Sequence, residues 1–135
     1  MNRGSVDLTV RKTLALRAAQ IALEKKAGDV VIMDLKGLSS IADFFVICSG
    51  GSDVHVKAIS KHIEDSLLEE SKGEEKVKPW HIEGHDTLRW VLLDYVHVIV
   101  HVFREETRDY YGLERLWGDA KMERVEDLPA GDRNA

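Results

Sequence analysis

Two short runs of this chain are apolar at almost every position, and they restrict the fold more than any other feature. The first is VVIMDL, residues Val30 to Leu35, and the second is DFFVICSG, residues Asp43 to Gly50. A strand with one face in water alternates apolar and polar residues, whereas a strand covered on both faces need not alternate. We therefore expect two strands in a sheet that has helices packed on it, which is an α/β arrangement.

Apolar spacing and turn residues divide the rest of the chain into further elements. Apolar residues at helical spacing predict helices at both ends and in the middle, and other runs predict three more strands. Pro79 lies in one of these strands, which favours an edge position because proline has no N–H for a sheet ladder. In chain order, the further elements are a helix from Ser5 to Ala27, a helix from Ser52 to Ser71, the edge strand around Pro79, a hairpin of Thr87 to Asp94 with His97 to Phe103, and a helix from Glu105 to Trp117.

These elements predict one domain over residues 1–118, with a single mixed sheet of about five strands flanked by helices. Residues 119–135 are polar and are expected to form a flexible C-terminal tail. In the last helix, Tyr110, Leu113 and Trp117 are expected in the core. That helix carries more large apolar residues than one core stripe needs, so part of it could cover a dimer partner.

The composition argues against several classes of protein. The chain has 135 residues, of which 19 are Lys or Arg and 24 are Asp or Glu, so its net charge is −5. Proteins that bind bare nucleic acid usually have a basic surplus, because contacts with phosphates supply much of their affinity. The single cysteine, Cys48, excludes an internal disulfide and fits a reducing cytoplasm. No apolar run reaches 18 residues, so we expect no transmembrane helix, and the first residues lack the apolar core of a signal peptide.

Three blocks of the chain resemble the ribosomal silencing factor family, also called the Iojap family, and they occur in the family's order and spacing. The resemblance covers about Val6 to Trp117. The blocks are DLKGLSSIADFFVICSGGSDVHVKAI (Asp34 to Ile59), EGHDTLRWVLLDYVHVIVHVF (Glu83 to Phe103) and RDYYGLERLW (Arg108 to Trp117).

The resemblance implies a partner and a role. Members bind the large-subunit ribosomal protein numbered fourteen, stop the two subunits from associating, and so lower translation when nutrients are short. They have a fold similar to that of nucleotidyltransferases, lack that activity, and tend to be homodimers. A chain of this family is expected in the cytoplasm, without a cofactor. The negative charge of this chain favours a basic ribosomal protein over RNA as its direct contact.

The candidate binding surface centres on the strand from Thr87 to Asp94. Alternation places Trp90, Leu92 and Asp94 on one side of this strand. Trp90 could be an interface anchor or a core residue, and the residues alone leave the two equal. The resemblance favours the interface, because relatives have a tryptophan at the matching position. The residues expected to bind the partner are Trp90, Asp94, Tyr95, Arg104 and Glu105; for the charged ones the alternative is a merely solvated rim.

An enzymatic alternative rests on the turn from Ser49 to Ser52, Ser-Gly-Gly-Ser, which precedes a predicted helix. Such a turn could hold an anion at the helix N-terminus, as in a nucleotidyltransferase or nucleotide-binding protein. Metal-dependent phosphoryl transfer also needs paired carboxylates, and no strand after that helix has two at alternate positions. With one cysteine and no His-Glu-x-x-His motif, no metal site is expected either. We therefore favour a structural turn and a non-catalytic protein.

Two positions depart from the family's pattern. Relatives usually have Gly followed by Asp between the hairpin strands, where this chain has Val96 and His97. A turn that needs a positive φ is costly for a β-branched residue, so the conformation of this turn is open. Gly112 stands within the predicted last helix, where it should cost roughly 1 kcal/mol relative to alanine.

Overall fold

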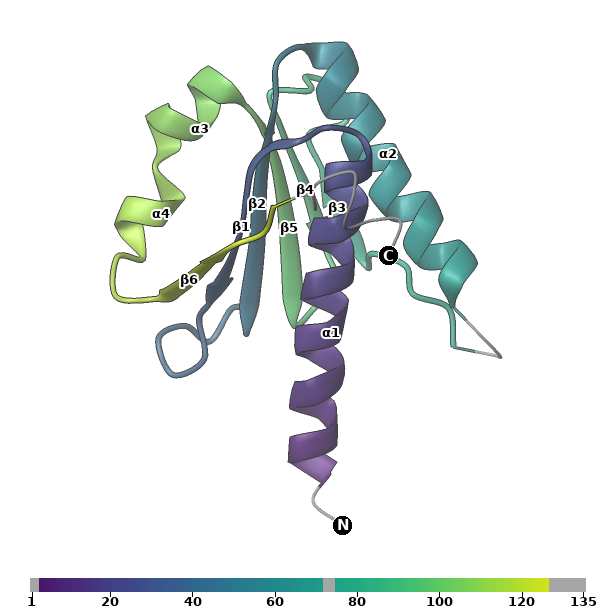
Figure 1. The fold of residues 1–135 in the computed structure, drawn as a ribbon, viewed down its shortest axis with the longest axis vertical. Helices are drawn as coiled ribbons and strands as arrows, with labels where there is room; N and C mark the ends of the chain where they lie inside the picture. Colours follow the sequence, from purple (N-terminus) through teal and green to yellow (C-terminus); the bar gives the residue numbers. More distant parts are fainter. Residues whose placement is uncertain (1–2, 72–74, 127–135) are drawn as a thin grey trace.

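The structure is a computed structural model that describes residues 3–71 and 75–126, which form one six-stranded sheet with helices on both faces (Figure 1). The sheet order is β3-β4-β5-β2-β1-β6. The elements, in chain order, are α1 (Arg3–Glu24), β1 (Gly28–Asp34), β2 (Phe44–Gly50), α2 (Asp53–Glu70), β3 (His81–Glu83), β4 (Trp90–Asp94), β5 (Val98–Arg104), α3 (Glu105–Tyr111), α4 (Leu113–Leu116) and β6 (Lys121–Arg124).

The sheet is mixed, as predicted. The central pair β2 and β5 is parallel, and all other neighbouring strands are antiparallel. The predicted single α/β domain is therefore confirmed, with six strands in place of about five. The strand predicted around Pro79 is β3, at one edge of the sheet; it begins at His81, after the proline. No helix among the described residues is long and apolar enough to cross a membrane.

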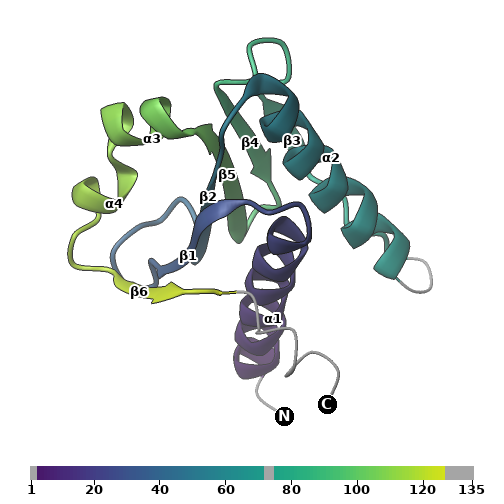
Figure 2. The ribbon, with the colours of Figure 1, turned by 45° about the horizontal axis from the view of Figure 1, so that its top comes forward.

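The two apolar runs form β1 and β2, and their burial follows from their position. Every residue of β2 is buried, because β2 lies between β5 and β1 and has helices over both faces. Helices α1 and α2 lie on one side of the sheet, and α3 and α4 lie on the other (Figures 1 and 2). A strand enclosed in this way has no position at which a polar side chain would reach water.

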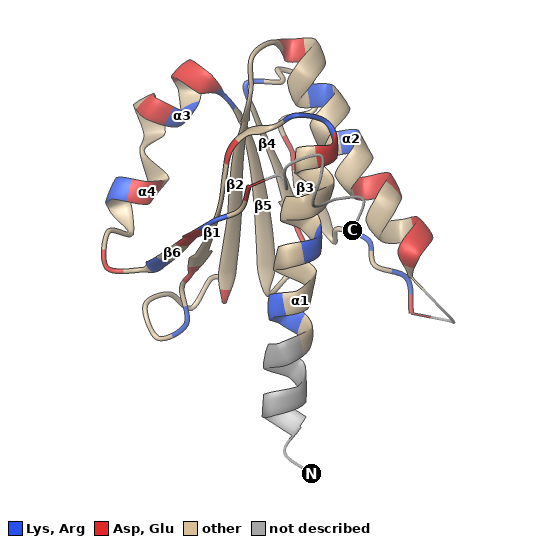
Figure 3. Ribbon diagram, in the orientation of Figure 1, with Lys and Arg blue, Asp and Glu red and all other residues tan. Residues whose placement is uncertain are grey.

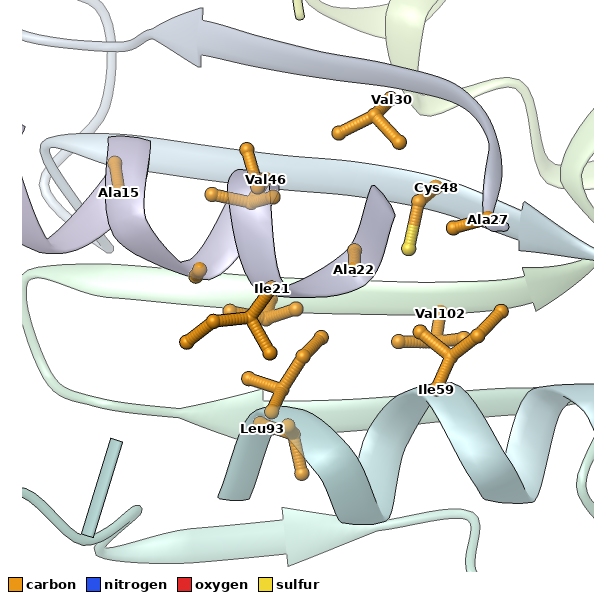
Figure 4. Packing of buried hydrophobic residues seen from close by; sticks show 14 of the residues in the cluster. Ala15, Ile21, Ala22, Ala27, Val30, Val46, Cys48, Ile59, Leu93 and Val102 are labelled. Carbon is orange, nitrogen blue, oxygen red and sulfur yellow. The ribbon is translucent and has the colours of Figure 1, made fainter. Parts of the chain in front are cut away.

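The larger hydrophobic cluster fills the space between the sheet and helices α1 and α2 (Figure 4). Helix α1 contributes small residues, since Ala15, Ala18 and Ala22 are completely buried. Small side chains allow a helix backbone to come close to a sheet, while Ile59 and Ile63 of α2 fill the wider part. Cys48 belongs to this cluster, as expected for a small apolar residue, and burial raises the pKa of its thiol to about 12.

The opposite face is covered less completely. Its cluster contains Phe45, Ile47 and Phe103 from the sheet, with Leu113 and Trp117 packed against it. Tyr110, expected in this core, is instead 81% exposed. The reason is that the last helix is interrupted, so its two halves turn different sides toward the sheet.

The prediction of one helix from Glu105 to Trp117 is wrong at Gly112. This residue adopts the left-handed conformation, with φ 57° and ψ 45°, and its N–H donates to the carbonyl of Arg108 at 2.9 Å. That arrangement ends α3, and α4 begins at the next residue. Gly112 is therefore a helix terminator and not a weak residue inside a helix.

Residues 119–135 were expected to be a tail, but Lys121–Arg124 form strand β6, which pairs with β1. The backbone N–H of Val125 continues this pairing by donating to the carbonyl of Val30 at 2.8 Å. All four β6 residues are exposed, so the strand is held by backbone hydrogen bonds and has little apolar burial of its own. This explains why its sequence has no strand pattern. The last part of the predicted tail, 127–135, lies outside the described residues.

The predicted hairpin of β4 and β5 is confirmed, and its turn has a positive φ at the β-branched residue. Val96 has φ 75°, and the N–H of His97 donates to the carbonyl of Tyr95 at 3.0 Å. This three-residue turn with positive φ is a strained form. The Asp94 carboxylate accepts a hydrogen bond from the Val96 N–H at 2.8 Å, which helps to hold the turn.

Candidate protein-binding surface

A cleft of about 860 Å³ opens on the face of the sheet that α3 and α4 cover incompletely. We call it the Trp90 cleft. It lies where the start of β4 and the segment before it meet α3 and the first residue of α2. Aromatic residues and carboxylates dominate its lining, which consists of Trp90, Leu92, Tyr110, Tyr111, Asp53, Glu83, Glu106, Arg89, Thr87, Thr107 and Gly84.

Trp90 is partly buried and is held from several sides. Its ring stacks on Phe103 with centroids 4.7 Å apart, and the Tyr111 ring lies 4.7 Å away at 47°. Its indole N–H donates to Nδ1 of His101 at 3.1 Å. Trp90 thus packs on the hydrophobic cluster and also lines the cleft. It combines the core position and the surface position, which the sequence left as equal alternatives.

His101 is a buried neutral residue that positions the tryptophan. Burial lowers the pKa of its imidazole to about 3, because the charged form would lose its solvation inside the sheet. Since Nδ1 accepts the indole hydrogen bond, the imidazole proton is on Nε2, which has no partner in the described structure. His101 is therefore a hydrogen-bonded histidine within the sheet.

Arg104 lies at the same end of the hairpin as Trp90. Trp90 pairs with Phe103, and the Arg104 N–H donates to the carbonyl of Arg89 at 2.9 Å. The Arg104 guanidinium contacts Asp53 at 2.7 Å and Glu106 at 2.8 Å, which joins the starts of α2 and α3. The hydrogen bond to Asp53 is the main cause of the raised pKa of Arg104.

Glu105 does not line the Trp90 cleft. It lines a second, polar hollow together with Asp29 and Arg108. The next residue, Glu106, takes the position that the sequence assigned to Glu105, because consecutive residues of a helix point about 100° apart. Glu105 stays a proposed contact at the margin of this surface.

Asp94 and Tyr95 lie away from Trp90, at the opposite end of the hairpin. Asp94 pairs with Ile99 and is four residues along β4 from Trp90, about 13 Å in an extended strand. Grouping Asp94 and Tyr95 with Arg104 was wrong. Asp94 and Tyr95 lie at the turn of the antiparallel hairpin, whereas Arg104 lies at its open end. Asp94 shares the sheet face with Trp90, and its carboxylate holds the turn.

Tyr95 is a core residue, which corrects its assignment as a surface contact. It is 8% exposed and belongs to the cluster under α1 and α2, on the face opposite the Trp90 cleft. Burial raises the pKa of its phenol, and the hydroxyl has no hydrogen-bond partner in the described structure. A side chain in this position cannot reach a partner protein.

The turn from Ser49 to Ser52 uses its polar groups within the fold. The Ser49 hydroxyl accepts a hydrogen bond from Arg108 at 2.8 Å, and the Gly51 N–H donates to Nδ1 of His55 at 3.1 Å. Ser52 caps α2 by accepting from the His55 N–H. A Cβ at Gly50 would lie 3.0 Å from Val56, so this glycine is required for packing. These contacts favour the structural turn over an anion site. Among the described residues, no group of three or more His, Cys, Asp or Glu side chains could hold a metal ion.

Of the expected binding residues only Trp90 lines the cleft, and the lining residues that sequence reasoning missed include Glu83, Glu106, Tyr110 and Tyr111. A signal for the two tyrosines was available, because Gly112 directly follows them and could have been taken as a helix terminator. Two large aromatic residues in the last turn of a short helix then cannot both face the core. No local signal identified Glu83, which reaches the cleft only through the pairing of β3 with β4.

Comparisons with known proteins agree with one another. The family model described as "Ribosomal silencing factor during starvation" matches residues 9–135. The chain is 42% identical over 112 residues to "Ribosomal silencing factor RsfS" of Bacillus subtilis, covering 83% of this chain and 91% of that protein. It is 44% identical to the protein of the same name from Halalkalibacterium halodurans, over 78% of this chain and 86% of the other. More distant is "Protein Iojap-related, mitochondrial" of Arabidopsis thaliana, at 31% identity over 73% of this chain and 53% of that protein.

Two solved structures have similar folds. A crystal structure from Chromobacterium violaceum has a TM-score of 0.69 and 30% identity, covering 90% of this chain and 95% of that one. A crystal structure from Bacillus halodurans has a TM-score of 0.64 and 37% identity, covering 85% of this chain and 95% of the other.

Proposed function

This chain belongs to the ribosomal silencing factor family, and from that premise we propose that it represses translation by binding the large ribosomal subunit. Family membership implies a translation-regulating role at the ribosome, and the relatives' names describe a silencing factor, not an enzyme. The finer proposal is that the chain binds ribosomal protein fourteen and that its bulk blocks association with the small subunit.

The observation that carries this proposal is the Trp90 cleft. Tryptophan and tyrosine are common anchors of protein interfaces, because they bury a large area with few rotatable bonds. Trp90, Tyr110 and Tyr111 together line an open cleft, and the last two are 81% and 51% exposed. Trp90 also lies within the block from Glu83 to Phe103 that resembles the family, and that resemblance supports an interface role for it.

The proposed mechanism is steric and needs no chemical step. A protein that occupies the surface where the subunits meet prevents joining for as long as it stays bound. Its effect therefore depends on affinity and on the dissociation rate, which is where most affinity differences between related complexes arise. The net charge of −5 supports a basic protein as the contact, with little or no direct binding to nucleic acid.

Two further parts of the proposal concern the state of the protein. We propose that it acts in the cytoplasm, where its partner is located, and that it forms a homodimer. Leu116 of α4, which is 70% exposed and lies outside the Trp90 cleft, offers part of a surface for a second copy. Sedimentation equilibrium of the purified protein tests the dimer, and a molecular mass that stays monomeric at high concentration contradicts it.

The deciding experiment is co-sedimentation of the purified protein with isolated large and small subunits on sucrose gradients. We expect it with the large subunit only. Trp90→Ala should weaken this binding by about 2 kcal/mol or more, roughly 30-fold, if Trp90 is an interface anchor. Trp80→Ala is the matched control, because Trp80 is 74% exposed and lies outside the cleft.

Trp90→Ala needs a folding check before its binding is compared with that of the control, since Trp90 also packs on Phe103. Circular dichroism and the melting temperature establish that Trp90→Ala is folded at the assay temperature. A folded Trp90→Ala protein that sediments with large subunits as well as the wild type does would remove Trp90 from the interface. A wild-type protein without preference for large subunits would reject the proposed function.

The nucleotidyltransferase alternative has its own test. A ligand that binds only the native state raises the melting temperature. We expect no rise with nucleoside triphosphates and magnesium or manganese, because Ser49, Gly51 and Ser52 already have partners within the fold. A concentration-dependent rise would bring this alternative back.

A further inference from the structure

The walls of the Trp90 cleft are aromatic rings set at steep angles to one another. The rings of Tyr110 and Tyr111 are 5.1 Å apart at 89°, and the rings of Tyr111 and Trp90 are 4.7 Å apart at 47°. Residues of the described fold leave much of these rings uncovered, since Tyr110 is 81% exposed. Large aromatic faces that line an open cleft have surface available for a ligand.

The charges around these rings are mainly negative. Asp53, Glu83 and Glu106 line the cleft, with Arg89 as the lining cation. Arg104 lies against Asp53 and Glu106 and compensates part of their charge. Counting these three acids and two arginines leaves a net charge of −1. Acidic residues occupy the starts of α2 and α3 on either side of this region (Figure 3).

Glu83 is the carboxylate best placed to receive an added positive charge. Asp53 and Glu106 share the Arg104 guanidinium, with N–O distances of 2.7 and 2.8 Å. The basic group near Glu83 is His81, at 3.5 Å, and a histidine is charged only when protonated. Glu83 also sits on the edge strand β3 and lines the cleft.

We propose that the Trp90 cleft receives a lysine or arginine side chain of the protein partner, held between the tyrosine rings and Glu83. This inference rests on the proposed function, because it specifies what the partner inserts at that surface. The face of an aromatic ring carries negative potential and attracts a cation, and nearby carboxylates strengthen the attraction. An acidic side chain would meet the same negative ring faces and a set of charged groups that sum to −1, so the cleft favours the cation.

The first test uses the protein without a ribosome. The probe is N-acetyl-arginine methylamide, and the readout is the indole N–H resonance of Trp90, assigned with Trp90→Phe. N-acetyl-citrulline methylamide is the neutral control of nearly the same shape, and N-acetyl-glutamate methylamide is the negative one. We expect a saturable shift with the arginine derivative only. An equal shift with citrulline, a larger shift with glutamate, or no shift with arginine overturns the inference.

Variants separate the charge and the ring from general damage. Glu83→Gln should weaken binding of the arginine derivative about 3-fold or more, while Glu69→Gln, an exposed acid on α2, should leave it unchanged. Tyr110→Leu keeps an apolar side chain but removes the ring, and it should weaken binding by a similar factor. Tyr110→Phe should restore it, which a merely structural role of Tyr110 would not require.

The same variants, measured with large subunits, distinguish two kinds of failure. If the wild type binds large subunits but Glu83→Gln and Tyr110→Leu bind as tightly as Glu69→Gln, the proposed function stands and the cation site is wrong. If the arginine derivative binds in the cleft but the wild type ignores large subunits, the site stands and the ribosomal partner is wrong. We expect both variants to bind large subunits about 3-fold more weakly or worse, with a smaller dependence on salt for Glu83→Gln.

Discussion

At the residue scale, the pair of Trp90 and His101 shows how a buried strand supports a surface. The indole N–H of Trp90 needs an acceptor, and the sheet interior offers Nδ1 of His101 at 3.1 Å. This bond fixes the orientation of the tryptophan ring that lines the cleft. The cost is a histidine whose protonation is disfavoured while it stays buried, because burial lowers its pKa, and this makes the stability of the fold depend on pH.

The pH dependence has a definite sign. The pKa of His101 is about 3 in the folded protein and about 6.5 when exposed, so below pH 6.5 the unfolded chain takes up a proton that the folded chain does not. Stability is therefore present above the unfolded pKa and is lost as the pH falls toward 3. Between pH 7 and pH 5 the loss from this residue should be about 2 kcal/mol.

Urea denaturation of wild type and His101→Gln at the two pH values measures this loss. The variant keeps an amide for the indole N–H but has no titrating group, so its stability should fall less over the same interval. Other histidines contribute equally to both proteins and cancel in the difference. Parallel losses in the two proteins would show that His101 titrates normally.

Val96 is a second residue whose conformation has a measurable cost. Its φ of 75° is unfavourable for a β-branched side chain. We expect Val96→Gly to raise the free energy of unfolding by about 1 kcal/mol. Val96→Ala is the control, because it shortens the side chain but keeps most of the penalty for positive φ; equal stability of the two variants would contradict this explanation.

At the scale of elements, the break between α3 and α4 creates one wall of the cleft. Because α3 ends at Tyr111, the two tyrosines of its last turn lie beside the sheet and only partly on it. Arg108, which is 8% exposed, anchors the helix pair by binding Glu114 at 3.0 Å and Ser49 at 2.8 Å. These contacts of Arg108 hold the break between α3 and α4 in place, so the break is a fixed part of the cleft surface.

Gly112→Ala tests the break by the sign of its effect. In a helix interior this change would stabilise the protein by about 1 kcal/mol. At φ 57° we expect it to destabilise by about 1 kcal/mol, and the new Cβ would clash with the Arg115 guanidinium. Thermal or urea unfolding measures the change. Gly112→Ala in an Arg115→Ala background separates the backbone from the contact, and a stabilised Gly112→Ala would show that the helix is continuous.

At the scale of the whole molecule, the sheet has one closed face and one partly open face. Helices α1 and α2, with 22 and 18 residues, cover the first, whereas α3 and α4 have only 7 and 4 residues (Figure 2). The uncovered part of the second face is where we propose that the partner binds. A binding protein of this design acts through its size and position.

A steric mechanism predicts that the order of addition matters. Protein added to large subunits before small subunits should prevent joining, with full inhibition near equimolar amounts. Added to joined ribosomes, it should have little effect until they dissociate, because the small subunit covers the site. Light scattering follows joining, and Trp90→Ala is the control. Inhibition at far below equimolar amounts, or equal inhibition in both orders, would indicate a different mechanism.

Much of the fold could be predicted because it depends on patterns along the chain. The apolar runs of β1 and β2, the hairpin of β4 and β5, and the edge position of β3 each follow from local residue types. Helix α2 begins and ends beside the serines that cap it, Ser52 and Ser71. The acidic composition and the family blocks likewise point to a protein that binds, independently of any coordinates.

Only the tertiary structure decided which residues lie close together in space. Trp90 and Arg104 lie at the same end of the hairpin because the register pairs Trp90 with Phe103, while the same register places Asp94 at the other end, and Tyr95 is buried in the core. Strand β6 forms through backbone hydrogen bonds to β1, and no side-chain pattern in its sequence predicts this pairing. The physical reason is that side-chain periodicity encodes which face of an element is buried, whereas a site is assembled from pairings between elements distant in the chain.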